Sequence, residues 1–65
     1  MQGFVKWFSQ AKGYGFITGQ CGSDFFCHYT NIEAEGYKNL EDGQEVEFEP
    51  EDTHRGPQAV NVRAI

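Results

Sequence analysis

The 65-residue sequence has few cations, few cysteines and no long apolar stretch, and each shortage excludes a class of protein. Five lysines and arginines stand against ten acidic residues, which argues against a partner held mainly by neutralised phosphates. Two cysteines are too few for the disulfide framework of a small secreted domain. No apolar run approaches the roughly 20 residues of a membrane helix, and the first residues lack the pattern of a signal peptide. We therefore expect a cytoplasmic protein that does not associate with membranes.

The chain is also too short for more than one domain. A chain of this size buries only about 60% of the surface that its unfolded form exposes, so we expect a single domain over residues 1–65. A multi-step active site with a cofactor pocket is not expected in so small a core. The charge is divided unevenly: residues 1–32 hold two lysines and one aspartate, whereas residues 33–65 hold nine acids and three cations.

The residue pattern predicts strands. No segment has apolar residues at helical spacing over ten or more positions, and eight glycines divide the chain into short segments rich in aromatic and β-branched residues. Strands are predicted near residues 3–9, 14–19, 24–29, 44–50 and 57–64, with turns at 10–13, 20–23 and 52–56. Between the third and fourth strands we expect a single helical or 3₁₀ turn, begun by Asn31, running over residues 32–35 and ended by Gly36, followed by a surface loop over 37–43. Five short strands favour an all-β, closed or nearly closed barrel.

Alternation within the strands separates core from surface. In residues 44–50 it places Glu45, Glu47 and Glu49 on the solvent side as an acidic row. The apolar residues on the opposite faces form the predicted core: Val5, Ile17, Phe25, Cys27, Val46, Phe48, Val60 and Val62.

Ten aromatic residues are more than so small a core can hide, since each ring has roughly 150–250 Å² to bury. Alternation places Tyr14 and Phe16 on one strand face, and Phe26 and His28 on one face of the next strand. If these strands pair through the 20–23 turn, the four side chains share a surface on which bases can stack. Trp7 or Phe8 adds a further ring, although alternation does not decide which. A buried aromatic stripe is the alternative, but Lys6, Lys12 and His28 interleave with the rings, which favours an exposed platform.

Other chemistries fit the sequence less well. Cys21, Cys27, His28 and His54 are zinc-type ligands, but Cys27 and His28 are adjacent on a strand and point to opposite faces, so neither a metal nor a cofactor is expected. A histidine next to aromatic residues more often stacks or stays solvated, and no nucleophile lies within the motif spacing of either histidine, so we do not expect an enzyme. A small barrel with exposed rings could instead bind Pro-rich or extended peptides, and this remains the alternative function.

Four motifs in order resemble one family. The run Lys-Gly-Tyr-Gly-Phe-Ile at 12–17 resembles a ribonucleoprotein motif, but an RNA-recognition-motif domain needs two helices that the sequence does not offer. Together with residues 6–8 (Lys-Trp-Phe), 24–29 (Asp-Phe-Phe-Cys-His-Tyr) and 55–59 (Arg-Gly-Pro-Gln-Ala), this run resembles the bacterial cold-shock proteins over about residues 3–62. The chain differs from the family pattern at Ser9, commonly Asn, and at Ala11, usually acidic. Phe25 and Cys27 stand at positions that are usually aliphatic.

The resemblance implies a five-stranded antiparallel OB-type barrel, acting as a monomer, that binds single-stranded RNA and DNA. It also implies RNA-chaperone or gene-regulatory roles in the cytoplasm and a preference for pyrimidine-rich strands. The family's base-stacking positions correspond to Trp7, Tyr14, Phe16, Phe26, His28, Tyr29 and Tyr37. Its backbone-contacting and hydrogen-bonding positions correspond to Lys6, Lys12, Asp24 and Arg55.

Magnitudes indicate which force would hold such a strand. Lys6, Lys12, Lys38 and Arg55 allow at most about four phosphate contacts, whereas each stacked base contributes about 1–3 kcal/mol. Stacking is therefore expected to dominate the affinity, and Phe16→Ala is expected to weaken binding with little effect on folding.

Overall fold

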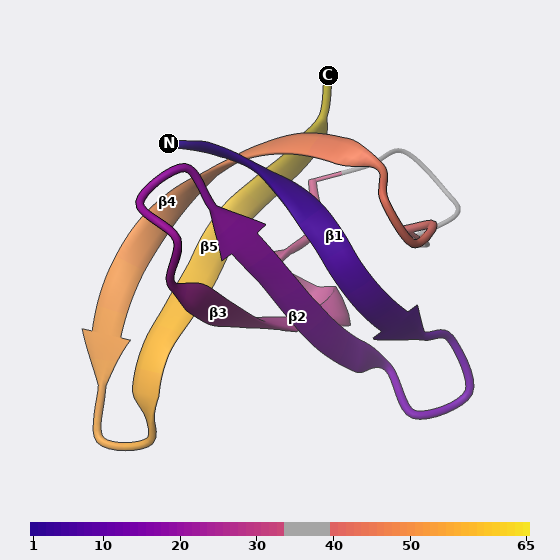
Figure 1. The fold of residues 1–65 in the computed structure, drawn as a ribbon. Coiled ribbons are helices and arrows are strands. Elements are labelled where there is room, and N and C mark those ends of the chain that lie inside the picture. Colours follow the sequence, from indigo (N-terminus) through magenta and orange to yellow (C-terminus); the bar gives the residue numbers. More distant parts are fainter. Residues whose placement is uncertain (34–39) are drawn as a thin grey trace.

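The computed structural model describes residues 1–33 and 40–65, and within these ranges the chain forms a small closed barrel. Its elements are β1 (Gln2–Ser9), β2 (Tyr14–Gly19), β3 (Asp24–His28), the 3₁₀ turn η1 (Tyr29–Asn31), β4 (Glu45–Thr53) and β5 (Gly56–Ala64). The strands close in the order β1-β2-β3-β5-β4, with β4 returning to β1 (Figure 1). The predicted five-stranded OB-type barrel is confirmed. No helix in the described ranges is long and apolar enough to cross a membrane.

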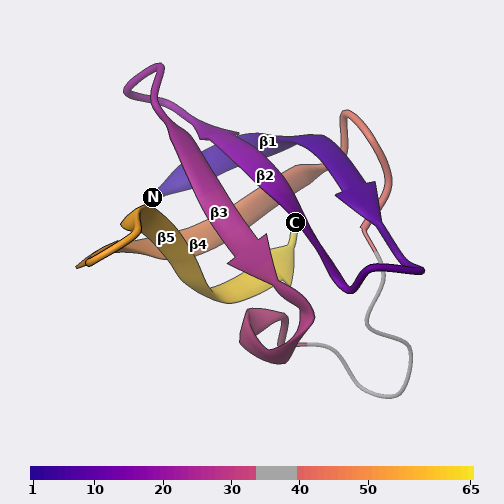
Figure 2. The same cartoon turned by 90° about the horizontal axis from the view of Figure 1, so that it is seen from below.

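Two antiparallel units, a three-stranded meander and a hairpin, supply most of the pairing. β1, β2 and β3 form an antiparallel meander, and β4 and β5 form a second, longer antiparallel pair. The two units join along β1 and β4, which are antiparallel, and along β3 and β5, which are parallel at Phe26 and Gln58. Seen from below, β3 runs beside the curved end of β5 (Figure 2). This parallel junction brings the β4–β5 hairpin next to a strand some thirty residues earlier in the sequence.

The core lies between the inner faces of the strands. Ile17, Cys27 and Val46 are fully buried there, and the rings of Phe25 and Phe48 pack with their centroids 5.1 Å apart. Seven of the eight predicted core residues are buried. Leu40 is buried as well, although it belongs to the segment expected to be a surface loop.

The prediction for Val60 is wrong, because Val60 is only half-buried and Ala59 takes its place in the core. The cause is a β-bulge in β5. Between the pairs Glu47–Arg63 and Glu49–Val60, two residues of β5 lie opposite one residue of β4, and Asn61 has a φ of 52°. Such a bulge interrupts the alternation of strand faces, so residues 59 and 62 both point inward.

The helical turn expected to begin at Asn31 lies earlier. The 3₁₀ turn η1 ends at Asn31, and Ile32 is already extended and pairs with Val62. Ile32 is 3% exposed, and this burial against β5 draws the chain out of the helical conformation. Glu35 and Gly36 lie outside the described residues.

Gly15 permits the close contact between β1 and β2. A Cβ atom on Gly15 would lie 2.2 Å from the carbonyl oxygen of Trp7 and 2.6 Å from the Cα of Phe8. Because both of these are backbone atoms, no side-chain movement could relieve the contact, so the position requires glycine.

The two cysteines are free thiols in different surroundings. Cys27 is buried in the barrel, and this burial raises the pKa of its thiol to about 12. Cys21 is exposed in the β2–β3 turn, where the pKa of its thiol is lowered, chiefly by a hydrogen bond with the Ser23 backbone. They are not joined by a disulfide.

Candidate nucleic-acid interface

Aromatic side chains from β2 and β3 meet on the outer face of the barrel. Tyr14 pairs across the strands with His28, and Phe16 pairs with Phe26, as alternation and the 20–23 turn predicted. The ring centroids of Phe16 and Phe26 are 5.7 Å apart, and those of Tyr14 and Phe26 are 5.6 Å apart. All four side chains are half-buried, so each ring keeps an edge or face open to solvent.

Trp7 joins this cluster because β1 contains a bulge. The register between β1 and β2 shifts between the pairs Val5–Ile17 and Trp7–Phe16, so β1 carries one extra residue there. Lys6 and Trp7 therefore both point outward, while Phe8 turns inward and packs against the core. The Trp7 ring lies 5.6 Å from Phe16 and 6.0 Å from Tyr14 between centroids. We refer to Trp7, Tyr14, Phe16 and Phe26 as the ring platform.

His28 and Tyr29 extend the ring platform at the end of β3. Their ring centroids are 4.7 Å apart, and Tyr29 is exposed. The Nδ1 atom of His28 accepts from the backbone N–H of Thr30 at 3.4 Å and lies 2.9 Å from the Thr30 hydroxyl oxygen. These two contacts with Thr30 hold the imidazole in place beside the Tyr29 ring.

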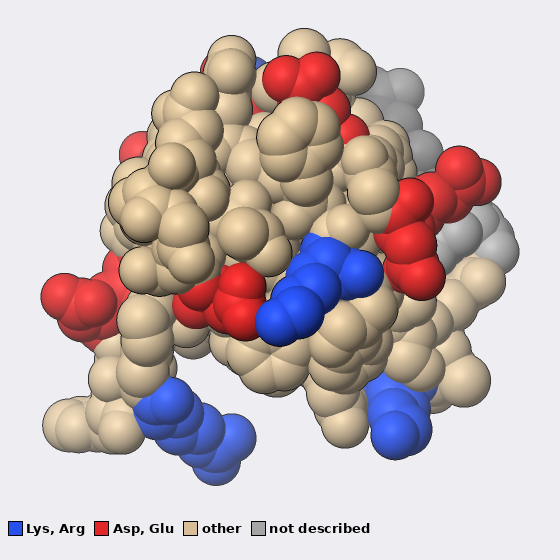
Figure 3. All heavy atoms as spheres, in the orientation of Figure 1, with Lys and Arg blue, Asp and Glu red and all other residues tan. Residues whose placement is uncertain are grey.

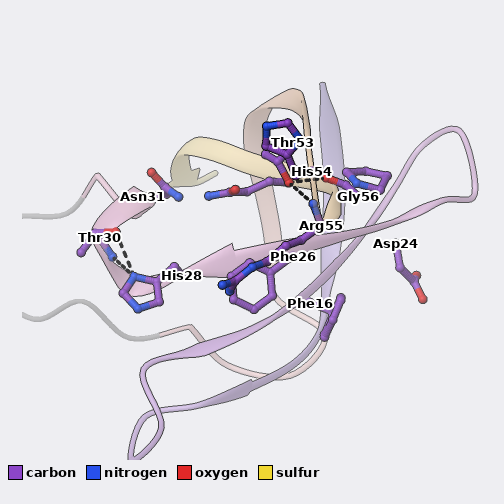
Figure 4. Close-up of a pocket in the computed structure, with 12 residues that line it drawn as sticks. Phe16, Asp24, Phe26, His28, Thr30, Asn31, Thr53, His54, Arg55 and Gly56 are labelled. Carbon is purple, nitrogen blue, oxygen red and sulfur yellow. Dashed lines mark hydrogen bonds between the residues drawn. The ribbon is translucent and has the colours of Figure 1, made fainter.

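A groove of about 620 Å³ lies between the outward side chains of β2 and β3 and the tip of the β4–β5 hairpin. Figure 4 shows Phe16, Phe26 and His28 along one side, with Thr53 and Arg55 of the hairpin across from them. The hairpin is held by the Thr53 hydroxyl, which donates to the carbonyl of Gly56 at 2.8 Å and accepts from the N–H of Arg55 at 3.2 Å. The parallel junction of β3 and β5 therefore places a cation beside the rings.

Lys6 and Asp24 form an ion pair at the other margin of the ring platform. The Lys6 ammonium donates to Asp24 at 2.8 Å, and the Thr18 hydroxyl donates to the same carboxylate at 3.0 Å. These hydrogen bonds, that of Lys6 first, lower the pKa of Asp24. Both side chains are about half exposed, so the pair contributes little to stability. It does hold a donor and an acceptor at the edge of the rings.

Lys12 lies in the β1–β2 turn. This turn is closed by the N–H of Gly13, which donates to the carbonyl of Ser9 at 2.8 Å, and Gly13 has a φ of 81°. The Ser9 hydroxyl accepts from the N–H of Lys12 at 3.3 Å. Figure 3 shows cationic side chains at separate places on one face, over the middle of β1, at this turn and at the β4–β5 hairpin.

The structure thus brings ten of the eleven predicted site residues around one surface, while Tyr37 lies outside the described residues, as does Lys38. Thr30, Thr53 and His54 also line the groove, although the sequence analysis did not place them at a nucleic-acid site. The groove forms only when the β4–β5 hairpin is brought beside β3, and no local pattern signals that contact. The outward position of Phe4 was also not predicted, although its alternation with the inward Val5 could have placed it on the outer face.

Comparison with known proteins gives the family. A model of the "'Cold-shock' DNA-binding domain" matches residues 1–65. The chain belongs to the cold-shock domain family. Cold shock protein 1 of Lactiplantibacillus plantarum is 57% identical over 60 residues, which are 92% of this chain and 91% of that protein. CspB of Geobacillus stearothermophilus is 59% identical over 61 residues, 94% of this chain and 92% of that protein. The cold shock-like protein of Thermotoga maritima is 52% identical over 65 residues, 100% of this chain and 98% of that protein.

The fold agrees with that of a distant cold-shock domain. A structure of Drosophila Unr CSD456 superposes with a TM-score of 0.74 at 22% identity, covering 98% of this chain and 26% of that longer chain. Membership of the family means that this cold-shock domain is a nucleic-acid-binding module and not an enzyme.

Proposed function

We propose that this cold-shock domain binds single-stranded RNA and DNA by stacking successive bases on the ring platform. The observation that carries the proposal is the mutual contact of Trp7, Tyr14, Phe16 and Phe26, at centroid distances of 5.6–6.0 Å, on an outer face of the barrel. Rings that are half-buried by one another remain available to a flat ligand. Every base has such a face, so binding should tolerate many sequences.

Side chains at the margins suit a phosphate backbone and base edges. Lys6, Lys12 and Arg55 are exposed, and the imidazole of His28 and the carboxylate of Asp24 supply hydrogen-bonding groups. Duplex should bind poorly, because its paired and stacked bases offer no free faces. In the cell such binding would keep RNA single-stranded, so the proposed role is that of a cytoplasmic RNA chaperone or regulator of transcription or translation in the cold-shock response.

The test uses the fluorescence of Trp7, the single tryptophan of the chain. The protein is titrated with a short oligo-dT, its RNA counterpart, an oligo-dA and a duplex. We expect saturable quenching by the single strands and none by the duplex, with the order of affinities giving the base preference. Quenching by duplex as strong as by single strands would contradict stacking on the ring platform. An absence of quenching by any nucleic acid, combined with binding of a Pro-rich peptide, would favour a peptide-binding barrel instead.

A further inference from the structure

Phe4 is the most exposed aromatic residue in the described part of the chain, with 56% of its surface accessible. It lies on β1 between the inward-facing Gly3 and Val5, so alternation directs its ring to the outer face of the barrel. Trp7 lies on the same strand and is 37% exposed. Single exposed apolar side chains are common on protein surfaces, so the case for Phe4 rests on where it lies relative to the ring platform.

The pairing of the strands places Phe4 one row beyond the ring platform. In one row across the sheet, Trp7 pairs with Phe16 and Phe16 with Phe26. In a neighbouring row Phe4 pairs with Thr18, and Thr18 pairs with Asp24. Diagonal neighbours on two paired strands have Cα atoms about 7–8 Å apart, a distance that aromatic side chains can span. Phe4 therefore lies on the same outer face as the ring platform, one row away from Phe16 along β2.

A cation stands between the two rows. Lys6 lies on β1 between Phe4 and Trp7, and its ammonium reaches across to Asp24. This ion pair is exposed, so exchanging the carboxylate for another anion costs little. A phosphate that links a base over Trp7 to a base over Phe4 would have a cation beside it.

On the opposite side, Phe4 borders an acidic residue of β4. There Phe4 pairs with Glu45 of β4. Beyond Glu45 lies the exposed Ile65, whose N–H donates to the Glu45 carbonyl at 3.2 Å. The carboxylate of Glu45 repels phosphate. A nucleic-acid strand that reaches Phe4 is therefore expected to arrive from the ring platform and to end there.

We propose that Phe4 stacks one further base of the single strand that occupies the ring platform, with Lys6 placed for the phosphate between that base and the base over Trp7. This proposal rests on the proposed function and adds a subsite to it. It makes the site one nucleotide longer at the end of the ring platform that lies toward the start of β1.

The test measures affinity against oligonucleotide length. Oligothymidines are lengthened one nucleotide at a time, separately at the 5′ and 3′ ends, and titrated against the wild type, Phe4→Ala, Phe4→Leu and Phe4→Tyr. In the wild type, one added nucleotide at one end should raise the affinity by about 5- to 150-fold, the value of one stacked base. Phe4→Ala and Phe4→Leu should lose this gain and bind shorter oligonucleotides as the wild type does, whereas Phe4→Tyr should keep it.

Control variants separate a stacking subsite from a general loss of apolar surface or of stability. Ile65→Ala removes another exposed apolar side chain, 65% accessible, and should leave the gain intact. Urea unfolding checks that each variant is folded, and Phe4→Leu keeps apolar area while removing the aromatic face. Phe16→Ala should weaken binding of oligonucleotides of every length, including those too short to reach Phe4.

The outcomes distinguish this inference from the proposed function. If the wild type binds single strands and Phe4→Ala matches it at every length, Phe4 is not a subsite although the domain still binds. If the wild type binds no single strand, the proposed function itself fails. A concentration-dependent dimer in sedimentation that Phe4→Ala abolishes, without any change in the length dependence, would make Phe4 a contact between copies and overturn the proposal.

Discussion

Replacement of Phe16 by alanine tests two roles of a ring in the ring platform, which are to stack a base and to stabilise the fold. Phe16 lies in the middle of the ring platform, with its centroid 5.6 Å from Trp7 and 5.7 Å from Phe26. Loss of one stacked base should cost about 1–3 kcal/mol of binding free energy, which is about a 5- to 150-fold rise in Kd. Each ring contact contributes about 0.5–1.5 kcal/mol. Phe16→Ala should therefore also lower the free energy of unfolding by about 1–3 kcal/mol, more than the sequence alone indicated.

The matched control is the next residue on the same strand. Ile17 is fully buried on the opposite face of β2, and Ile17→Val should cost about 0.5–1.5 kcal/mol of unfolding free energy without changing binding. Binding is measured by the fluorescence anisotropy of a labelled oligo-dT, because Trp7 touches the altered ring. Stability is measured by urea unfolding followed by circular dichroism. If folded Phe16→Ala binds oligo-dT as the wild type does, stacking on Phe16 is refuted.

Four further predictions follow from charge, burial and backbone geometry. A plot of log affinity against log salt concentration for single-stranded nucleic acid should have a slope no steeper than about −3, because at most about four cations can contact phosphates. A slope steeper than about −4 would contradict stacking-dominated binding. The melting temperature should rise with added salt, since nine acids lie within residues 33–52; a constant melting temperature would show that their repulsion is unimportant. A thiol reagent should modify Cys21 rapidly and Cys27 only on unfolding, and equal rates in the folded protein would be inconsistent with the burial of Cys27. Gly15→Ala should lower the free energy of unfolding by more than Gly22→Ala does. A Cβ atom at Gly22 would meet no neighbour, so that variant should lose only the about 1–2 kcal/mol that a positive φ costs. Chemical unfolding of the two variants tests this order.

The sequence predicted the strands and the outward rings of β2 and β3 because these depend on a local property, the alternation of side chains. Tyr14, Phe16, Phe26 and His28 all lie where alternation placed them. The sequence did not decide between Trp7 and Phe8. That choice depends on the bulge in β1, which is set by how β1 pairs with β2 and not by the β1 sequence alone.

The errors have the same physical origin. Ala59 replaces Val60 in the core because a bulge in β5 shifts the strand against β4. Leu40 and Ile32 enter the core from segments without a strand pattern, since burial of apolar area against distant strands outweighs local preference. The groove beside Arg55 needs the parallel junction of β3 with β5, which joins segments that are far apart along the chain.

The position of β4 has a consequence for how several molecules share one strand of nucleic acid. In the closed barrel β4 is separated from β2 by β1 and from β3 by β5, so its row of glutamates lies across the barrel from the rings of β2 and β3. Domains bound in succession along one nucleic-acid strand would expose these negatively charged surfaces to the solvent. At physiological salt such charges act over about 8 Å, which is enough to repel a second nucleic-acid strand or a neighbouring coated one. We therefore expect coated strands to stay apart, without being cross-linked or compacted by the protein that covers them.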